Sequence, residues 1–527
     1  MKKKFYVTTA IDYVNAKPHI GHAYQKIIAD ILARWHRQRK EDVFFLTGTD
    51  EYGQKIAECA KEARKTPEKF VGEMSKEFKN AWDSLNLSYD KFIRTTDKEH
   101  EEKVIEFIKL VDKKGDIYKG KYSGLYCIGC EAYYTEKDLI NGKCPFHPNK
   151  KIIQFTEEAY FFRLSKYQNQ LLEFYDKTSD FIIPHSRRNE IINRVREGIR
   201  DLNITRTNFK WGIPFPLDKD HVTYVWFDAL LNYITGIDWP NKKFKKFWPA
   251  DVQLLGVDNS WFHCVIWPAM LFSAGIKPPK SILINGFLTV EGRKISKSLG
   301  NAISPLVLVK KYGSDSVRYF VARNFVFGQD GDFSEDALIR RHNGELADKL
   351  GNLVSRVSAL AEKYGLEKFE SKISLDGERK KLLREGKLER GTIEISDKEI
   401  LHFLKRKKNK SLQVEPGEEF PLLLSYPQIF FEVTSSAVEE YLEKFELDKA
   451  LNEIFAFIDF CNEYIQENKI WETKDKRMLY VLVEAIRKIN FYLAPFMPET
   501  SEKIVKIFKG DKIKKAEPLF KKIDLNK

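Results

Sequence analysis

The sequence has few cysteines and no long apolar run, and these two absences exclude two classes of protein. Six cysteines in 527 residues are too few for a disulfide framework, which argues against a disulfide-rich secreted protein. No stretch approaches the roughly 18 consecutive apolar residues that a membrane-spanning helix requires. The first residues, MKKKFYVTTAIDYVNAK, start like a signal peptide, but Asp12, Asn15 and Lys17 interrupt the apolar run. We therefore expect a cytoplasmic protein with no membrane association.

The composition is that of a globular protein with an excess of positive charge. A hydrophobic content of 43% with 31% charged residues excludes a disordered or fibrous chain. A length of 527 residues predicts two to four domains. Lys and Arg outnumber Asp and Glu by 89 − 76 = 13. Such an excess permits a polyanionic partner such as a nucleic acid, but it also occurs on lysine-rich surfaces that bind none.

The spacing of apolar residues predicts that the chain begins with a parallel sheet. Residues 5–11 and 42–48 are typical of buried strands. The segment 21–38 between them carries apolar side chains at helical spacing, namely Ala23, Ile27, Ile28, Ile31, Leu32 and Trp35. Strand, helix and strand form a βαβ unit. Ligands bind at the carboxyl ends of such strands, where we expect the His19 segment and Asp50 to lie.

Later segments predict that this sheet is interrupted by an insertion and then resumed. Strand-like runs return at 222–227, 251–256 and 281–288, and after residue 336 apolar stripes at 346–361 and 478–494 indicate helices. The insertion carries two close pairs, C-x2-C at 127–130 and C-x2-H at 144–147, which are typical of a zinc knuckle. The predicted fold class is therefore α/β, a Rossmann-like parallel sheet interrupted by a zinc-knuckle insertion and followed by an α-helical domain. The expected boundaries are 1–116 for the first half of the sheet domain, 117–215 for the insertion, 216–335 for the second half, and 336–527 for the helical domain with a charged, exposed insertion near 366–415.

Three cysteines and one histidine predict a metal site. CIGC (127–130) and CPFH (144–147) supply two close pairs, Cys127 with Cys130 and Cys144 with His147, separated by a short loop. That spacing suits a tetrahedral Zn²⁺ held by three thiolates and one imidazole. The alternative is four unlinked residues in a polar loop. Four protein ligands leave no open position, so we expect one structural Zn²⁺ per chain.

Two segments are candidates for binding phosphate, although G-x-x-x-x-G-K-[ST] and G-x-G-x-x-G are both absent. In PHIGH, Gly21 permits close approach of a ligand, and His19 and His22 stand where a helix N-terminus favours an anion. In GRKISKSLGN (292–301), Lys294 and Lys297 stand in a glycine-flanked loop after a strand. Each segment alone also suits ordinary surface. Together, each after a strand of one sheet, they predict a triphosphate held from two sides.

HIGH followed by KISKS, a variant of KMSKS, resembles the paired signatures of class I aminoacyl-tRNA synthetases. The resemblance narrows to the methionyl-tRNA synthetases through TTAIDYVNAKPHIGHAY, FLTGTDEYG, the cysteine knuckle, WGIPFP, YVWFDALLNYITG, KISKSLGN and NLVSR. It covers the chain apart from residues 366–415. It implies a ligase that converts methionine and ATP to methionyl-adenylate and pyrophosphate. Methionine is then transferred to the 3′-terminal ribose of its tRNA, with both initiator and elongator methionine tRNA as expected partners and the preference between them left open.

The resemblance also implies roles for individual residues. The residues implied to bind ATP are His19, Gly21, His22, Gly256, Asp258, Lys294, Ser296 and Lys297. Four of them are implied to be catalytic through contacts with the phosphates: His19, His22, Lys294 and Lys297. Mg²⁺ is implied to accompany ATP. Those implied for methionine are Ala10, Ile11, Tyr13, Asp50, Trp226, Ala229, Tyr233 and His263, with Asp50 pairing with the α-ammonium group. Those implied for the anticodon are Asn352, Arg356 and Trp471. Asn259 departs from the family, where an apolar residue is usual, and receives no methionine contact. KRKKNK (405–410) either touches the tRNA backbone or is a solvated charged run.

Other readings account for fewer of these features. Synthetases for isoleucine, valine or leucine share both signatures but carry a large editing insertion, for which the stretch from His22 to Lys294 has no room. A cysteine enzyme would place zinc in the amino-acid site. A non-enzymatic tRNA-binding paralogue would have lost signature residues, and a general nucleotidyltransferase leaves NLVSR unexplained. The chain ends at Lys527 without the appendage that some family members use to dimerise. We therefore expect a monomer, with a separate tRNA-binding partner chain left open.

Overall fold

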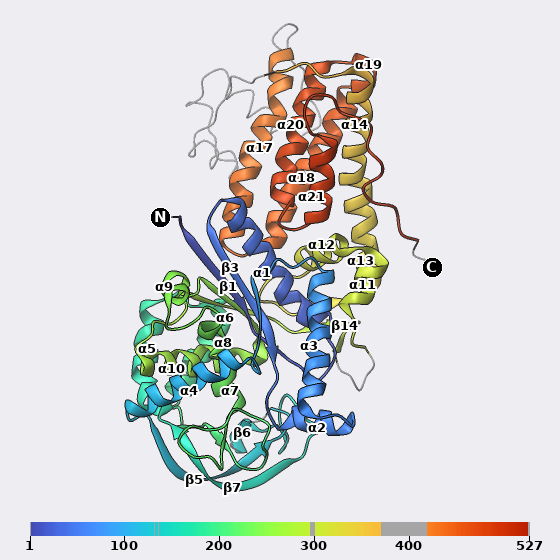
Figure 1. Ribbon diagram of the computed structural model, residues 1–527. Helices are drawn as coiled ribbons and strands as arrows, with labels where there is room; N and C mark the ends of the chain where they lie inside the picture. The colour runs from blue at the N-terminus through green and yellow to red at the C-terminus, as the bar shows by residue number, and fades with distance from the viewer. Residues whose placement is uncertain (1, 131, 135, 296–300, 370–418, 525–527) are drawn as a thin grey trace. The chain divides into compact units, whose positions relative to one another are not determined.

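The structure, a computed structural model, describes residues 2–130, 132–134, 136–295, 301–369 and 419–524. It divides into two compact units, drawn together in Figure 1. The first comprises Met1–Leu308 with Gly328–Asp332, and the second comprises Val309–Phe327 with Phe333–Lys527. Within the described ranges, no helix has both the length and the apolar character that crossing a membrane requires.

A parallel sheet organises the first unit. In the described part of the chain it has seven strands. Across the sheet their order is β2 (Asp12–Tyr13), β3 (Asp42–Asp50), β1 (Lys4–Thr9), β12 (Val252–Gly256), β13 (Ser281–Asn285) and β8 (Ile182–Ile183), with β4 (Lys91–Arg94) also pairing with β3. All of these pairings are parallel. Because β12 pairs directly with β1, the prediction of a sheet that is interrupted and later resumed is confirmed.

Helix α1 (Ile20–Gln38) connects β1 to β3 and packs across β1, β3 and β12. The apolar residues that predicted it are all buried: Ala23, Ile27, Ile28, Ile31, Leu32 and Trp35. Burying such a stripe against the sheet is what stabilises the helix, since propensity alone is weak. The βαβ unit therefore brings the start of α1 to the carboxyl ends of β1 and β3, as the sequence predicts.

The remaining helices of this unit enclose a second part of the core. Phe107, Leu46 and Trp267 belong to one large buried apolar cluster. The helices are α2 (Gln54–Glu62), α3 (Pro67–Ser84), α4 (Lys98–Lys113), α5 (Gln168–Lys177), α6 (His185–Arg196), α7 (Val225–Ala229), α8 (Asn232–Thr235), α9 (Lys242–Phe247) and α10 (Trp267–Ala274). Helix α4 packs against both α8 and α10, so residues far apart in sequence share this core.

The segment between β4 and β12 forms a separate antiparallel sheet. Its strand order is β6 (Ala132–Tyr134), β5 (Ile117–Cys127), β7 (Ile152–Phe162) and β9 (Leu202–Asn203). Figure 1 shows β5 and β7 as a long curved ribbon. A short pair, β10 (Thr205–Arg206) and β11 (Val222–Thr223), follows. The same stretch of sequence also supplies β8 to the parallel sheet.

Two of the expected strands differ in the structure. The strand expected at 222–227 is wrong beyond Thr223, because helix α7 begins at Val225. Its β-branched and aromatic residues suit a strand, but burial in the core of the unit overrides that preference. The strand expected at 281–288 ends at Asn285, and β14 (Leu288–Val290) is separate. The break lies at Gly286, where a Cβ would stand 2.3 Å from the carbonyl oxygen of Gln329.

Helices make up most of the described part of the second unit. They are α12 (Ser314–Asn324), α13 (Glu335–Arg341), η6 (His342–Gly351), α14 (Asn352–Tyr364), α17 (Glu419–Glu443), α18 (Leu447–Glu467), α19 (Ile470–Thr473), α20 (Lys476–Leu493) and α21 (Pro498–Ile507). Helices α14, α17, α18 and α20 run side by side as a bundle (Figure 1). The two apolar stripes that predicted helices fall on η6 with α14 and on α20. Most of the expected insertion at 366–415, including KRKKNK, lies outside the described residues.

Candidate active site and metal cluster

The two histidines of PHIGH form a reciprocal cap at the start of α1. His19 is the N-cap residue, and its Nδ1 accepts a hydrogen bond from the Gly21 amide at 3.2 Å. The Nδ1 of His22 accepts one from the His19 amide, also at 3.2 Å. The two rings lie 3.8 Å apart, centroid to centroid, and His22 meets the edge of Phe78 on α3. These contacts satisfy amide groups that a helix start otherwise leaves unpaired.

Both imidazoles are neutral at physiological pH. Burial lowers the pKa of His19 to about 4, with a smaller contribution from the positive charge of Lys26. Burial also places the pKa of His22 well below its usual value, and the charges of His19 and Lys26 act in the same direction. A neutral imidazole has one N–H, and each Nδ1 is here an acceptor, so each ring must have its proton on Nε2. The cap therefore orients two Nε2–H donors.

Ile295, in the segment that carries KISKS, lies close to the start of α1. A Cβ on Gly21 would lie 3.0 Å from Cε1 of His19 and 3.3 Å from Cδ1 of Ile295, so glycine permits the close approach. The amide of Ile20 also donates to the carbonyl of Ile303 at 2.9 Å. The structure thus brings together the two segments that the sequence predicts to hold a triphosphate.

The predicted lysines of that segment are described only in part. Lys294 lies in β15 (Arg293–Lys294) and pairs with Thr289 of β14, while its side chain is not described. Ser296 and Lys297 lie outside the described residues.

Gly256 and Asp258, predicted to lie near the nucleotide, follow the end of β12. A Cβ on Gly256 would stand 2.7 Å from Oδ1 of Asp258 and 3.3 Å from Nε2 of Gln25 on α1. The space next to Gly256 is therefore bordered by a carboxylate and an amide. A side chain at position 256 would collide with them, so the position requires glycine. The sequence prediction did not include Gln25, although its place one turn after Gly21 on the same helix was a usable signal.

Tyr233 and His263 form a buried chain of hydrogen bonds. The Tyr233 hydroxyl lies 2.6 Å from Nε2 of His263, and Nδ1 of His263 lies 2.9 Å from the carbonyl of Asn259. A carbonyl only accepts, so Nδ1 carries the proton of His263. Burial lowers the pKa of this imidazole to about 4, which keeps it neutral. Nε2 is then an acceptor, and the tyrosine must donate to it. Asn259 thus acts here through its backbone carbonyl, which any residue at that position would supply and which orients His263.

Of the other predicted methionine-pocket residues, Trp226 contacts this chain, and the rest are described by their burial or their place in the sheet. Ala10 and Ala229 are buried, Ile11 is partly buried beside the same core cluster, and Tyr13 pairs in register with Asp50. Trp226 lies 6.1 Å from the ring of His263, centroid to centroid. Ala10 and Tyr233 share one buried apolar cluster, against which Ile11, Tyr13 and Trp226 pack. The methionine roles of the eight residues remain a prediction.

Two aromatic residues that the prediction missed complete the region. Phe262 stacks on Trp226 with ring centroids 3.8 Å apart and planes 5° from parallel. The Tyr6 hydroxyl donates to the carbonyl of Tyr233 at 2.6 Å. Phe262 stands beside His263 in the sequence, which was a signal for it. Tyr6 gave none, because a tyrosine in a buried strand is ordinarily core.

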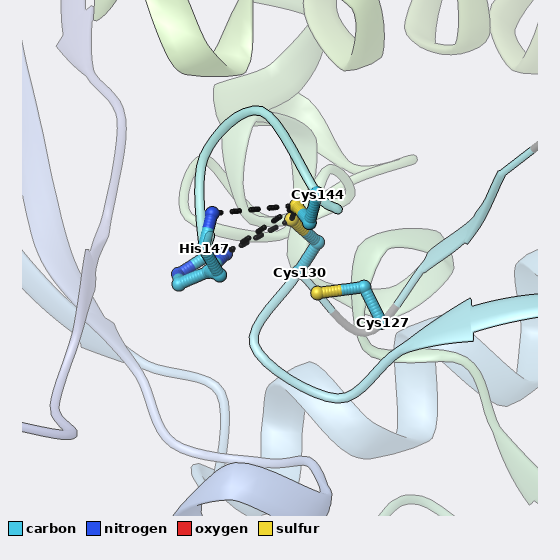
Figure 2. Close-up of side chains that lie close together, drawn as sticks. All are labelled: Cys127, Cys130, Cys144 and His147. Carbon is cyan, nitrogen blue, oxygen red and sulfur yellow. Dashed lines mark hydrogen bonds between the residues drawn. The ribbon is translucent and has the colours of Figure 1, made fainter. Parts of the chain in front are cut away.

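The four predicted metal ligands come together in the knuckle, as Figure 2 shows. One ligand atom from each of Cys127, Cys130, Cys144 and His147 lies within 4.8 Å of all the others. Sγ of Cys130 is 3.3 Å from Sγ of Cys144 and 3.1 Å from Nδ1 of His147. Gly129 permits this, since a Cβ there would stand 2.6 Å from the His147 ring. The hydrogen bond from the Cys130 thiol lowers the pKa of Cys127 and so favours its thiolate form. Such a set of donors can hold a metal ion.

The three predicted anticodon residues lie on two elements of the second unit. Asn352 and Arg356 stand one turn apart on α14, and Trp471 is in α19. The guanidinium of Arg356 lies 6.0 Å from the ring centroid of Trp471 and donates to Gln466 at 3.2 Å. Asn352 is exposed and donates to the carbonyl of Asp348 at 2.7 Å. The structure thus brings Arg356 against Trp471, with Asn352 beside them on the same helix.

Comparison with known proteins relates the whole chain to one family of ligases. A family model described as tRNA synthetases class I (M) matches residues 5–153 and 138–358, and one described as the anticodon-binding domain of tRNA ligase matches residues 430–524. A methionine--tRNA ligase of Thermotoga maritima is 41% identical, over 99% of this chain and 80% of the relative. One of Caldanaerobacter subterraneus is 40% identical, over 100% of this chain and 80% of the relative.

Solved structures show the same relationship. The methionyl-tRNA synthetase of Mycobacterium tuberculosis in complex with methionyl-adenylate is 36% identical and superimposes with a TM-score of 0.81, covering 96% of this chain and 94% of that one. A second structure of that enzyme bound by methionyl-adenylate is 34% identical with a TM-score of 0.84, covering 98% and 100%. With paired signature segments and a helical second unit that match these relatives along the chain, the protein belongs to the methionyl-tRNA synthetase family of class I aminoacyl-tRNA synthetases.

Proposed function

We propose that this chain activates methionine with ATP and charges tRNA with it, and that the predicted site residues carry out those steps. The observation that carries the proposal is the pair of Nε2–H donors on His19 and His22, held at the start of α1 beside the KISKS segment. A methionine carboxylate oxygen attacks the α-phosphorus of ATP, the bond to the bridging oxygen breaks, and pyrophosphate leaves. The tRNA 3′-terminal ribose hydroxyl then attacks the methionyl carbonyl, and AMP leaves.

The phosphate site acts by positioning and by stabilising charge, because the substrate supplies its own nucleophile. Neutral donors such as His19 and His22 can bond phosphate oxygens as negative charge moves onto the leaving pyrophosphate. Lys294 and Lys297 are proposed to contact the β- and γ-phosphates from the opposite side, with Ser296 beside them. Gly21 and Gly256 are proposed to let the nucleotide approach the backbone, and Asp258 to contact its ribose.

The amino-acid pocket suits a thioether side chain. Tyr13, Trp226 and Tyr233 provide aromatic surfaces, which attract a polarisable sulfur, and Ala10, Ile11 and Ala229 complete an apolar lining. The Tyr233 hydroxyl is already committed as a donor to His263, so its position is set before methionine arrives. Asp50 is proposed to pair with the α-ammonium group, which fixes the carboxylate end toward the phosphates.

The helical unit is proposed to read the anticodon of the methionine tRNAs, initiator and elongator. Arg356 beside Trp471 offers a planar cation and an aromatic ring on which a splayed base can stack, and exposed Asn352 offers an amide for a base edge. This surface belongs to the second unit and the activation site to the first. Loss of tRNA recognition should therefore leave methionine activation intact.

The metal requirements are proposed as follows. Cys127, Cys130, Cys144 and His147 hold one structural Zn²⁺, which ties together the loop between β5 and β7. The Tyr134 hydroxyl donates to Sγ of Cys130 at 2.9 Å, a contact that suits a metal-bound thiolate. Mg²⁺ arrives with ATP and neutralises phosphate charge. The protein is proposed to act in the cytoplasm as a monomer.

Methionine-dependent exchange of labelled pyrophosphate into ATP tests the function. Purified protein should exchange label when methionine is present and should show only background with isoleucine or cysteine. Equal exchange with those amino acids, or none with methionine, refutes the proposal. Transfer of labelled methionine to a methionine tRNA tests the second step, with a tRNA of another anticodon as the control.

A further inference from the structure

A charged pair lies buried directly beneath the proposed site. Lys26 of α1 and Asp12 of β2 expose 1% and 4% of their side chains. The lysine Nζ donates to Oδ1 of Asp12 at 2.5 Å and to the carbonyl of Ala10 at 3.0 Å. It also lies 5.7 Å from the ring centroid of Trp82 on α3. None of the site assignments above includes Lys26 or Asp12.

The pair joins the two halves of the activation site. Ala10, Ile11 and Tyr13, on either side of Asp12, are proposed to line the methionine pocket. The amide of Ala10 donates to the carbonyl of Leu254 on β12. Lys26 stands one turn after His22 on the helix that presents the phosphate donors. A single ammonium group therefore attaches the pocket stretch to the histidine helix, through one backbone carbonyl and one carboxylate.

The buried ion pair between Lys26 and Asp12 does not, on balance, stabilise the folded protein at neutral pH. Burial raises the pKa of Asp12 to about 6, against the attraction of Lys26, and burial lowers the pKa of Lys26. A carboxyl whose pKa is higher in the folded than in the unfolded protein favours folding when protonated. That contribution is lost as pH rises through about 6, so the ionised group opposes folding at neutral pH. Replacing a buried ion pair by apolar residues of similar volume is often neutral or stabilising.

We propose that Lys26 and Asp12 are positioning residues for methionine activation, which hold the methionine-pocket stretch and the histidine helix in the register that the reaction requires. The inference rests on the proposed function. Its physical basis is geometric, because in-line attack depends on the carboxylate of methionine reaching the α-phosphorus while His19 and His22 contact the phosphates. A small shift between the two halves of a site can cost orders of magnitude in rate.

The charge of Lys26 has a second effect at the same site. It contributes to lowering the pKa of both His19 and His22, which helps to keep them neutral donors. The groups that face Asp12 are Lys26 from α1, the indole of Trp82 from α3, and Thr49 opposite it in the register of β3. Lys26 is the charged group among them, so protonation of Asp12 leaves the lysine without its counter-charge.

The test replaces both charges with apolar groups of similar size in the full-length protein. The double variant Asp12→Leu/Lys26→Met should fold, with a thermal unfolding midpoint equal to or above that of the wild type. Its kcat for methionine-dependent pyrophosphate exchange should fall at least about tenfold, as for misplaced reacting groups, and its KM for methionine should rise. Arg34→Met is the matched control. It breaks the Arg34–Asp30 pair further along α1, and its exchange should equal that of the wild type.

A pH profile separates positioning from a merely structural role. Asp12→Asn removes the titrating group while keeping its shape, and its kcat at neutral pH should match the lowered kcat of the wild type below about pH 6. The ratio of Asp12→Asn to wild-type kcat should therefore approach one as pH falls, and taking the ratio cancels titration of ATP and pyrophosphate. A ratio that does not change with pH overturns the inference.

Two results with the double variant Asp12→Leu/Lys26→Met also overturn the inference. One is a kcat and KM equal to those of the wild type, and the other is a thermal unfolding midpoint below that of the wild type. If the wild type itself lacks exchange, the proposed function has failed. The unfolding midpoint still tests the inference in that case, because it requires no activity.

Discussion

Replacing His22 by Asn and by Ala separates its two roles. The His22 Nδ1 accepts the His19 amide at 3.2 Å, and its Nε2 is left as a donor. An asparagine Oδ1 can occupy the place of Nδ1, so His22→Asn keeps the cap and loses the donor, along with the ring contacts to His19 and Phe78 that both variants lose. His22→Ala loses both the cap and the donor. We therefore expect the two variants to differ in stability and to agree in activity.

The magnitudes follow from the type of contact that each variant loses. Loss of a donor to transition-state charge costs roughly 10²–10³ in kcat, or about 3–4 kcal/mol. Loss of a cap costs about 1 kcal/mol of stability. Both variants should therefore slow methionine-dependent pyrophosphate exchange by roughly 10²-fold or more, while only His22→Ala lowers the free energy of unfolding through the cap. Methionine affinity should change little, because the donor acts on phosphate.

The assays are pyrophosphate exchange at saturating methionine and ATP, calorimetric titration of methionine, and denaturant unfolding. His36→Asn is the control, since His36 lies near the other end of α1 and its Nδ1 contacts Glu41 at 2.9 Å. It should leave exchange unchanged. Wild-type exchange by His22→Asn, or a methionine affinity that falls in parallel with kcat, would refute the assignment of the Nε2 donor.

Three other predictions concern stability, metal and tRNA. Burial lowers the pKa of both His19 and His263 to about 4. The unfolded chain binds those two protons near pH 6.5, and together they outweigh the opposite effect of Asp12, whose pKa burial raises to about 6. The thermal midpoint should therefore fall as pH drops from about 6.5 to 4, and a midpoint constant over that range contradicts this. Cys144→Ser should reduce bound zinc from one ion per chain to well below one, measured by atomic spectroscopy after dialysis, and an unchanged zinc content contradicts the cluster. Arg356→Gln should lower the rate of tRNA charging about tenfold or more while leaving pyrophosphate exchange unaltered, and an equal loss in both assays counts against anticodon reading.

Much of the fold could be predicted because local patterns and the tertiary structure agree. The apolar stripe of residues 21–38 is helical in any context that buries one face, and α1 spans Ile20–Gln38. The metal cluster was predictable for a related reason, since two close ligand pairs need only a short loop to meet. At residues 222–227 local pattern and tertiary burial disagree, and burial decides in favour of a helix from Val225.

The pairing of Asp12 with Lys26 was not predictable from sequence. A lone aspartate in an apolar strand and a lone lysine in a helix each read as exposed residues, and only the packing of α1 against β2 makes them partners. The hydrogen that His22 carries on Nε2 was equally inaccessible. It follows from which nitrogen accepts the His19 amide, and that requires coordinates.

By itself the sequence indicated most of the strands and helices, the cluster of three cysteines and a histidine, and the two signature segments, because these depend on spacing along the chain. The tertiary structure alone decided which side chains are neutral, which nitrogen donates, and which buried charge joins the two halves of the activation site. Those properties depend on burial and on contacts between residues that no local pattern relates.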